Sequence, residues 1–174
     1  PGLIVSFTLL ALFPWLARWG IERVKIRRLY VRWPKPAHFD RNLVVIGAGA
    51  AGLVSAYVAA ATRAKVTLIE RHKMGGDCLN YGCVPSKALI RSATFLQQAK
   101  HAASLGIQRA DVTYDFADVM ARVQRIVKTV EPHDSVERYT SLGVEVLHGD
   151  ATIVSPRSVE VNGQTLTTRA IVVA

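Results

Sequence analysis

Two cysteines dominate the chemistry that this sequence allows. Cys78 and Cys83 are the only cysteines in 174 residues, and four residues separate them in the stretch GGDCLNYGCVPSK. Pro85 favours the first turn of a helix that continues through Ile90, which places Cys83 at a helix N-terminus. The helix dipole stabilises a thiolate there, so we expect Cys83 to be reactive. The pattern therefore favours a redox-active disulfide.

Other uses of the two thiols are a zinc site, a purely structural bridge and inert buried thiols. Residues five apart in a regular helix point about 140° apart, so any bridge requires a break in the helix, which Asn80 and Gly82 supply. A zinc site needs two further ligands, and only His72 is close in sequence, so we predict no metal site. A structural disulfide suits a cytoplasmic, cysteine-poor domain poorly.

A glycine motif, Gly47-x-Gly49-x-x-Gly52, follows the apolar run at residues 43–46. Such glycines let a strand turn into a helix, let a pyrophosphate approach the backbone, and let helix and strand pack closely. The phosphate would lie at the helix N-terminus. Glu70 ends the next expected strand, and its carboxylate would accept hydrogen bonds from an adenosine ribose. The alternative is that the glycines serve packing alone and Glu70 is an ordinary strand end.

The elements that must position these residues begin with a βαβ unit. Apolar patterning predicts a strand at 43–46, a close-packed helix over 53–61 and a strand at 65–70. Helices are expected over 87–103 and 116–130, the second between a cap at Asp115 and Pro132. Strands are expected at 144–146, 158–161, 164–168 and 170–173, with a hairpin turn at Asn162-Gly163. The sequence therefore predicts an α/β fold.

The N-terminal segment differs in composition from the rest of the chain. Residues 1–17 carry no charge, whereas residues 1–42 hold eight Lys or Arg against two acidic residues, +6 of the net +9. An apolar stretch followed by tryptophans and a basic cluster is typical of a membrane span that leaves the bilayer on the cytoplasmic side. Seventeen residues are short for a crossing of roughly 20. Because the chain starts at Pro1 and stops in an apolar run, we expect an interior piece of a longer protein.

Three alternatives to a membrane span apply to this segment. It can be a buried or interfacial helix interrupted at Pro14, a signal peptide or a nucleic-acid-binding arm. A signal peptide is disfavoured because its positive region should precede the apolar run. Nucleic acid is disfavoured because the basic excess is local. Two prolines mark residues 32–41 as a linker, so the predicted domains are 1–41, an apolar helix with a basic linker, and 42–174.

Together, the glycine motif, Glu70 and GGDCLNYGCVPSK resemble the class I pyridine nucleotide-disulfide oxidoreductases, the family of dihydrolipoamide dehydrogenase, glutathione reductase and mercuric reductase. The resemblance covers about residues 42–174. It implies the N-terminal part of a Rossmann-like FAD-binding domain with a small β-hairpin or meander, and FAD rather than NAD at the glycine motif. It further implies a downstream NAD(P)H domain, a dimerisation domain and a homodimer.

The resemblance also implies a role for each matching residue. Cys78 matches the interchange thiol that exchanges with substrate, and Cys83 matches the thiol that makes a charge-transfer contact with the flavin. Lys87 matches the lysine near the flavin N5. The cofactor-binding set implied is Gly47, Gly49, Ala51, Gly52, Glu70, Gly76, Asp77, Cys78, Lys87 and Ala151. The family's catalytic histidine and glutamate lie in a later domain, and none of His38, His72, His101, His133 or His148 matches that histidine.

The expected function is therefore that of an FAD-dependent enzyme of cell redox homeostasis. It would pass electrons between NAD(P)H, FAD and the Cys78–Cys83 disulfide to a small-molecule or protein disulfide, as dihydrolipoamide dehydrogenase does. A mercuric reductase shares every motif seen here and is the alternative. A membrane-tethered flavin-binding sensor module is an alternative of another class.

The N-terminal segment resembles that of bacterial proteins in which a DedA-like, SNARE-associated membrane domain precedes this oxidoreductase. The resemblance implies a bacterial inner membrane location with the catalytic domain in the cytoplasm. Without such an anchor we expect a cytoplasmic protein. No nucleic-acid partner is expected in either case.

Overall fold

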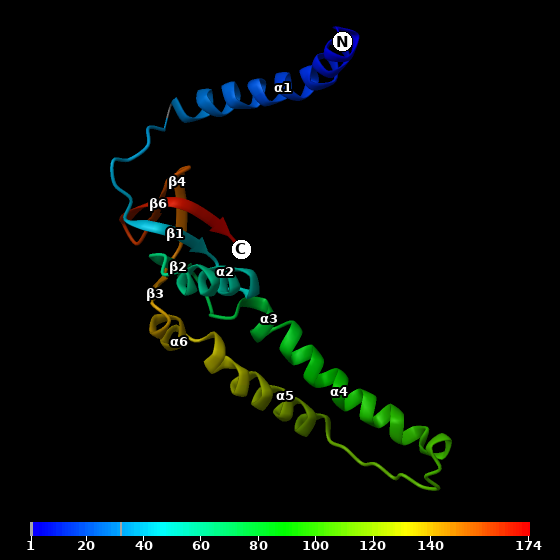
Figure 1. Cartoon of the computed structure of the whole chain (residues 1–174). Coiled ribbons are helices and arrows are strands. Elements are labelled where there is room, and N and C mark those ends of the chain that lie inside the picture. Colours follow the sequence, from blue (N-terminus) through cyan, green and yellow to red (C-terminus); the bar gives the residue numbers. More distant parts are fainter. Residues whose placement is uncertain (1, 32) are drawn as a thin grey trace. The chain divides into compact units, whose positions relative to one another are not determined.

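The computed structural model describes residues 2–31 and 33–174, with side chains from residue 12 onward except those of residues 29 and 32. The chain divides into two units, Pro1–Ala37 and His38–Ala174, each of which is described by itself (Figure 1). The predicted boundary lies at 41/42, and β1 (Arg41–Ile46) begins at that point.

The first unit consists of one helix, α1 (Gly2–Val31), which continues through Pro14 without the interruption considered above. Its described side chains change character along the axis. Leu12, Phe13 and Trp15, among the first of these side chains, are exposed, whereas basic residues concentrate towards the C-terminal end of the helix. Within the described part of the chain, no helix combines the length and the apolar character that a membrane crossing requires.

The second unit is built on a six-stranded sheet in the order β3-β2-β1-β6-β5-β4. Its other strands are β2 (Val66–Glu70), β3 (Val144–His148), β4 (Ala151–Ser155), β5 (Ser158–Val161) and β6 (Gln164–Val173). β3, β2, β1 and the second half of β6 run parallel. The first half of β6 pairs antiparallel with β5, which pairs antiparallel with β4. One ten-residue strand therefore joins a parallel and an antiparallel region.

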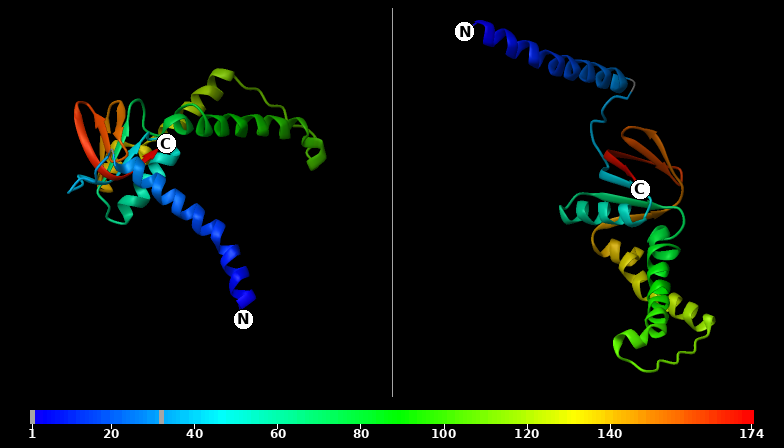
Figure 2. Two further views of the ribbon diagram at one scale, coloured as in Figure 1. Left: turned by 90° about the horizontal axis from the view of Figure 1, so that it is seen from above. Right: turned by 90° about the vertical axis from the view of Figure 1, so that its right-hand side faces the viewer.

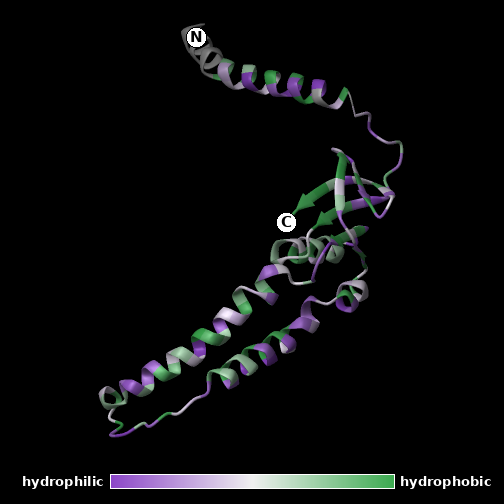
Figure 3. Cartoon of the chain, turned by 180° about the vertical axis from the view of Figure 1, so that it is seen from behind, coloured by the Kyte–Doolittle hydropathy of each residue, from purple (hydrophilic) through white to green (hydrophobic). Residues whose placement is uncertain are grey.

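The parallel region confirms the predicted βαβ unit. α2 (Ala50–Ala61) connects β1 to β2 and buries Leu53 and Ala56 against them. The same core contains Val45, Leu68 and Val144, one from each of three neighbouring strands. Strands buried on both faces form continuous apolar runs, which is why these segments were recognisable from the sequence. In Figure 3 the carboxyl-terminal ends of β1 and β6, beside the C-terminus, are green and therefore hydrophobic.

Two antiparallel helices project from the sheet and form what we call the helical arm, residues 83–130 (Figures 1 and 2). It comprises α4 (Cys83–Lys100), the 3-10 turn η1 (Ala102–Leu105), an irregular loop and α5 (Phe116–Val130). Asp115 caps α5 as predicted, because its carboxylate accepts a 2.8 Å hydrogen bond from the backbone N–H of Ala117. Gly106 ends η1 in the left-handed conformation.

Three short elements were not predicted from the sequence. They are α3 (Gly76–Asn80), α6 (Val136–Ser141) and β4, together with the 3-10 turn η2 (Glu131–Asp134) that precedes α6. The strands expected at 164–168 and 170–173 are one strand, β6. The hairpin turn at Asn162-Gly163 is confirmed, with φ of +51° and +76° at its two residues.

A polar network ties together the amino-terminal ends of β1, β2 and β3. The Arg41 guanidinium donates to Glu145 Oε2 at 2.6 Å and, through Nε, to Thr67 Oγ1 at 2.6 Å. The fully buried Thr67 hydroxyl in turn donates to Glu145 Oε2 at 2.6 Å. Burial acts to raise the pKa of Glu145, but the hydrogen bonds from Thr67 and Arg41 outweigh it and hold the pKa below its ordinary value.

We expect Glu145→Gln to destabilise the protein at pH 7 by about 1 kcal/mol, because a part-exposed ion pair with supporting hydrogen bonds is lost. Since the folded-state pKa of Glu145 is lowered, its contribution is present above the unfolded value of about 4.5 and is lost as the pH falls through the folded value. Urea unfolding of both proteins between pH 7 and pH 3 measures this. A stability difference that stays constant over that range would contradict the assignment.

Candidate functional site

The predicted site residues gather at the carboxyl ends of the parallel strands. A cavity of about 630 Å³ lies there, bounded by the ends of β1, β2 and β6, the first turn of α2, helix α3 and the turn after β3. Strand order reverses between β1 and β6, so this cavity lies at the switch point where open α/β sheets bind ligands. The backbone N–H of Ala174 donates to Ile46 O at 2.9 Å and closes the sheet at that point.

The three glycines of the motif have different surroundings. A side chain at Gly47 would collide with the carbonyl of Ala174, and one at Gly52 would collide with the carbonyl of Gly47. A Cβ at Gly49, in contrast, would meet no atom within 4 Å. Gly49 lines the cavity, so a ligand can occupy the space that a side chain would fill. This arrangement separates two packing glycines from one that gives a ligand access to the backbone.

The first turn of α2 offers a site for an anion. Gly49 is the N-cap, no side chain caps the helix, and no acidic residue lies in its first turn. Ala50 and Ala51, the first two residues of the helix, line the cavity. The unpaired N–H groups and the positive end of the helix dipole favour a phosphate at this position. The residues present therefore fit the pyrophosphate of a dinucleotide.

Glu70 lies at the cavity wall at the end of β2. Its Oε2 accepts a 2.6 Å hydrogen bond from the backbone N–H of Ala48, and its Oε1 accepts a 2.7 Å bond from that of His72. These bonds hold the carboxylate at the glycine loop. Each carboxylate oxygen has a second lone pair, so Glu70 can also accept hydrogen bonds from ribose hydroxyls.

The cysteines lie on two consecutive helices. Cys78 is in the middle of α3, the chain leaves helical geometry at Tyr81 and Gly82, and Cys83 is the first residue of α4. The expected break in the helix is confirmed at Gly82, but Asn80 is not part of it, because Asn80 is the last residue of α3. Both thiols are free; Cys78 is half-buried and lines the cavity, whereas Cys83 is exposed. A hydrogen bond with Cys83, together with burial, raises the pKa of the Cys78 thiol.

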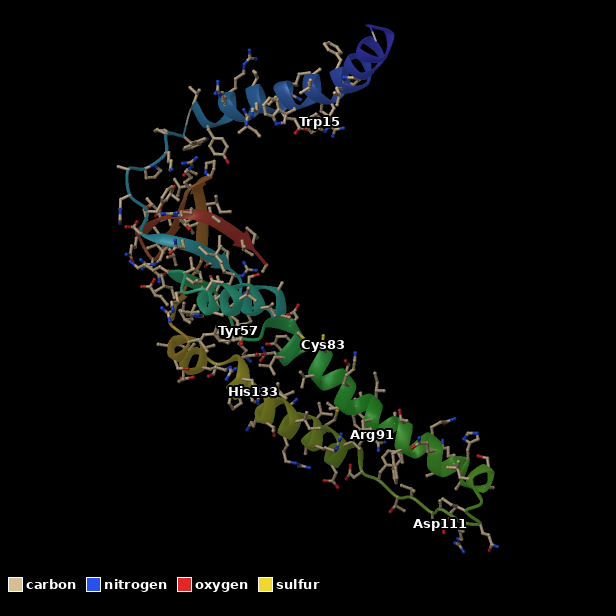
Figure 4. The ribbon with its side chains drawn as sticks, viewed as in Figure 1. Trp15, Tyr57, Cys83, Arg91, Asp111 and His133 are labelled. Carbon is tan, nitrogen blue, oxygen red and sulfur yellow. The ribbon has the colours of Figure 1, made fainter. Side chains whose placement is uncertain are left out.

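The structure also places the other residues of the predicted set. Asp77, Gly76 and Ala151 line the cavity with Cys78, although Ala151 lies 73 residues further along the chain. Ala151 is brought there because the N–H of Gly149 donates to Glu70 O at 2.9 Å, which holds the turn after β3 beside β2. Lys87 is exposed on α4, one turn after Cys83 and on the same side of the helix. Figure 4 shows Cys83 at the start of the helical arm, with Arg91 further along it.

Several residues at the cavity were not predicted. Arg71, His72 and Lys73 directly follow Glu70 and line its wall, and Tyr81 and Asp150 do so from other elements. The Lys73 ammonium lies 5.7 Å from the centre of the Tyr81 ring, within the range of a cation–π contact. The rule that ligands bind at strand carboxyl ends would have indicated residues 71–73.

Two further features bear on alternative sites. Across the described residues, no three His, Cys, Asp or Glu side chains are grouped so that they could hold a metal ion. A second hollow of about 380 Å³ lies on the helical arm, lined by residues that include Phe95, Tyr114 and Arg122, and it contains none of the predicted site residues.

The sheet order, the glycine loop and the cysteine pair beside it define a dinucleotide-binding domain with a thiol pair at its cavity. Residues 41–174 match the family model described as pyridine nucleotide-disulphide oxidoreductase. The chain belongs to this family.

Curated relatives and solved structures agree with this assignment. The chain is 40% identical to a dihydrolipoyl dehydrogenase of Geobacillus stearothermophilus over 140 residues, covering 78% of this chain and 29% of the relative. It is 33% identical to a mercuric reductase of Bacillus cereus over 137 residues, covering 79% of this chain and 22% of the relative. It superposes on the HOCl-induced flavoprotein disulfide reductase RclA from Escherichia coli with a TM-score of 0.60 and 26% identity, covering 76% of this chain and 27% of that one. The chain therefore spans less than a third of the length of these proteins.

Proposed function

We propose that this chain is the flavin-binding, disulfide-bearing part of an FAD-dependent NAD(P)-disulfide oxidoreductase. The observation that carries the proposal is the position of Cys78, on the wall of the cavity that is also lined by Gly49 and Glu70. A thiol on the wall of the dinucleotide site is placed to exchange electrons with a cofactor bound there. Membership of the family and the relatives' names support the same activity.

The chain's own residues would hold FAD in the following way. The N–H groups at the start of α2 would bind the pyrophosphate, and Gly49 would let it approach. Glu70 would accept hydrogen bonds from the adenosine ribose, and Ala151 would contact the adenine through its main chain. Bound FAD supplies two-electron transfer between NAD(P)H and the disulfide. NAD(P)H itself would bind to a downstream domain.

The thiol pair would transfer the electrons to substrate by disulfide exchange. In the dithiol form, the Cys78 thiolate attacks a substrate disulfide and forms a mixed disulfide, releasing one substrate thiol. The Cys83 thiolate then attacks the Cys78 sulfur, which releases the second substrate thiol and closes the Cys78–Cys83 disulfide. Lys87, one turn from Cys83, would place a cation on the side of α4 that carries this thiol.

The test is a reductive titration of the complete protein. We expect two electron pairs per subunit to be taken up, one by bound flavin and one by the cysteine pair. The Cys78→Ser/Cys83→Ser double variant should take up one pair fewer. An equal uptake of electrons by the two proteins would show that the cysteine pair is not a redox centre. If the purified wild-type protein contains no flavin, the assignment of FAD as its cofactor is wrong.

The relatives named mercuric reductase support Hg²⁺ as a second candidate substrate. The complete protein, assayed with NADPH or NADH and either lipoamide or Hg²⁺, distinguishes the two candidates. We propose lipoamide-like disulfides first, and a homodimer as the assembly, since the family's catalytic histidine and glutamate come from the partner subunit.

We further propose that the N-terminal unit attaches the protein to the bacterial inner membrane with its catalytic domain in the cytoplasm, behind a DedA-like domain. Exposed Leu12, Phe13, Trp15 and Trp19 suit an apolar or interfacial environment, and the basic residues that follow suit anionic headgroups. Fractionation of cells that express the complete protein tests this proposal. Recovery in the membrane pellet is expected, and recovery in the supernatant at low salt would reject it. If high salt alone releases the protein from the membrane, the basic residues bind the membrane surface and the segment is not an anchor.

A further inference from the structure

The Asn80 side chain ties the end of the cysteine-bearing helix α3 both to the first residue of that helix, Gly76, and to the preceding turn at Met74. Its Nδ2 donates to the carbonyl of Met74 at 3.0 Å and to that of Gly76 at 2.8 Å. Asn80 is half-buried and is the last residue of α3. A helix of five residues is too short to be stable by itself, so it depends on such contacts. Leu79 anchors it in the core, but apolar contacts do not fix its rotation.

The turn that Asn80 holds is itself packed on the dinucleotide loop. Gly75 and Gly76 have φ of +81° and +52°, in the left-handed region that favours glycine. The N–H of Gly75 donates to Ala48 O at 2.9 Å, and a Cβ on Gly76 would lie only 2.8 Å from the Cα of Gly49. The Ala48 N–H in turn donates to the Glu70 carboxylate. A continuous series of hydrogen bonds and backbone contacts therefore links Glu70, the glycine loop, the turn at Gly75 and Asn80.

We propose that Asn80 is a positioning residue that fixes Cys78 at the wall of the dinucleotide cavity and thereby sets the thiol–disulfide equilibrium of the Cys78–Cys83 pair. The inference rests on the proposed function. The equilibrium between a dithiol and a disulfide depends on how well the two sulfurs are held together, because correct placement raises their effective concentration. Asn80 lies between the two cysteines in sequence and ends the helix that carries Cys78, so its two bonds restrain that helix just before the chain turns towards Cys83.

The experiment is the Asn80→Asp substitution in the complete protein, which keeps the side chain's shape and removes both donors. The purified protein is equilibrated with glutathione, so that the dithiol and glutathione disulfide convert to the protein disulfide and two glutathione molecules. We expect the equilibrium constant for forming the protein disulfide to fall about tenfold. For a two-electron couple, tenfold corresponds to a potential about 30 mV higher.

Asn162→Asp is the matched control, because Asn162 Nδ2 also donates to a backbone carbonyl, that of His148 at 2.9 Å, but on the β-hairpin. We expect its disulfide equilibrium to match wild type. Asn80→Ser, which retains one hydroxyl donor, is the second variant if Asn80→Asp does not fold. Its equilibrium constant should lie between that of wild type and the tenfold lower value expected for Asn80→Asp. An equilibrium constant within twofold of wild type in a folded Asn80 variant overturns the inference. A wild-type protein that lacks flavin, or whose cysteine pair takes up no electrons, overturns the proposed function instead.

Discussion

The Gly49→Val variant of the complete protein is expected to be folded and colourless. The backbone of Gly49 has φ of −73° and ψ of −178°, a conformation that any residue adopts. No protein atom lies within 4 Å of the added Cβ, which therefore points into open space at the cavity, and we expect the fold to accept the side chain. The branched side chain instead occupies the approach of the pyrophosphate to the start of α2. Losing two or more charge-assisted hydrogen bonds should weaken FAD binding about hundredfold or more.

Gly52→Ala is the matched comparison within the same motif. Its Cβ would collide with the carbonyl of Gly47 and lie 3.3 Å from a methyl group of Val45, in the packed core beneath the loop. We therefore expect Gly52→Ala to lower the unfolding temperature, whereas Gly49→Val leaves it close to that of the flavin-free wild type. Absorbance at the flavin bands and thermal unfolding measure the two effects. Full flavin content in Gly49→Val would reject the assignment of this loop.

The second large effect is expected from single serine substitutions at the two cysteines. In the complete protein, Cys78→Ser leaves Cys83 as a lone thiolate, and we expect a new long-wavelength charge-transfer absorption in the oxidised enzyme. Cys83→Ser should lack this absorption and leave Cys78 as the readily alkylated thiol. Both variants should lose disulfide reduction by about 10³-fold or more, because one thiol must attack and the other must resolve the mixed disulfide.

The double serine variant gives the baseline for alkylation, since these 174 residues contain no other cysteine. A charge-transfer band that appears in Cys83→Ser and not in Cys78→Ser would exchange the roles of the two thiols. Cys78 lines the cavity, whereas Cys83 lies exposed at the start of α4. The assignment of Cys83 to the flavin therefore comes from the family resemblance, and the position of the charge-transfer band tests it directly.

Helices and strands were predictable from the sequence where the local pattern of apolar residues matches the residues that the fold buries. The βαβ unit has doubly buried strands and a glycine turn, and α5 has apolar residues at intervals of three and four together with a cap at Asp115. α6 was missed because six residues are too few to show a helical period. β4 was missed because its central residues are exposed and show no alternation. β6 was divided in two because its first half is largely polar and its last four residues are an apolar run, with Arg169 between the two halves.

The sequence predicted which residue types carry the chemistry of the candidate site, but not which distant residues the fold brings to it. Gly47, Gly49, Glu70 and Cys78 were found because each lies in a motif with a chemical reason for its residue type. Arg71, His72 and Lys73 belong to no motif, and a charged run after a strand usually faces solvent. The approach of Ala151 depends on the bond from Gly149 to Glu70, a contact between residues 79 apart that no local pattern can show.

The pairing of β6 with β1 determines when this domain can be completed during synthesis. β1 is a central strand, yet Arg41 pairs with Thr168, and Ile46 with Val173. At translation rates of about 5 to 20 residues per second, one edge of β1 therefore lacks its neighbour for several seconds after β1 is made. Closing a contact of such high sequence separation is also slow. An uncovered apolar strand edge is prone to pair with other chains, so the nascent protein should depend on chaperones until β6 has emerged from the ribosome.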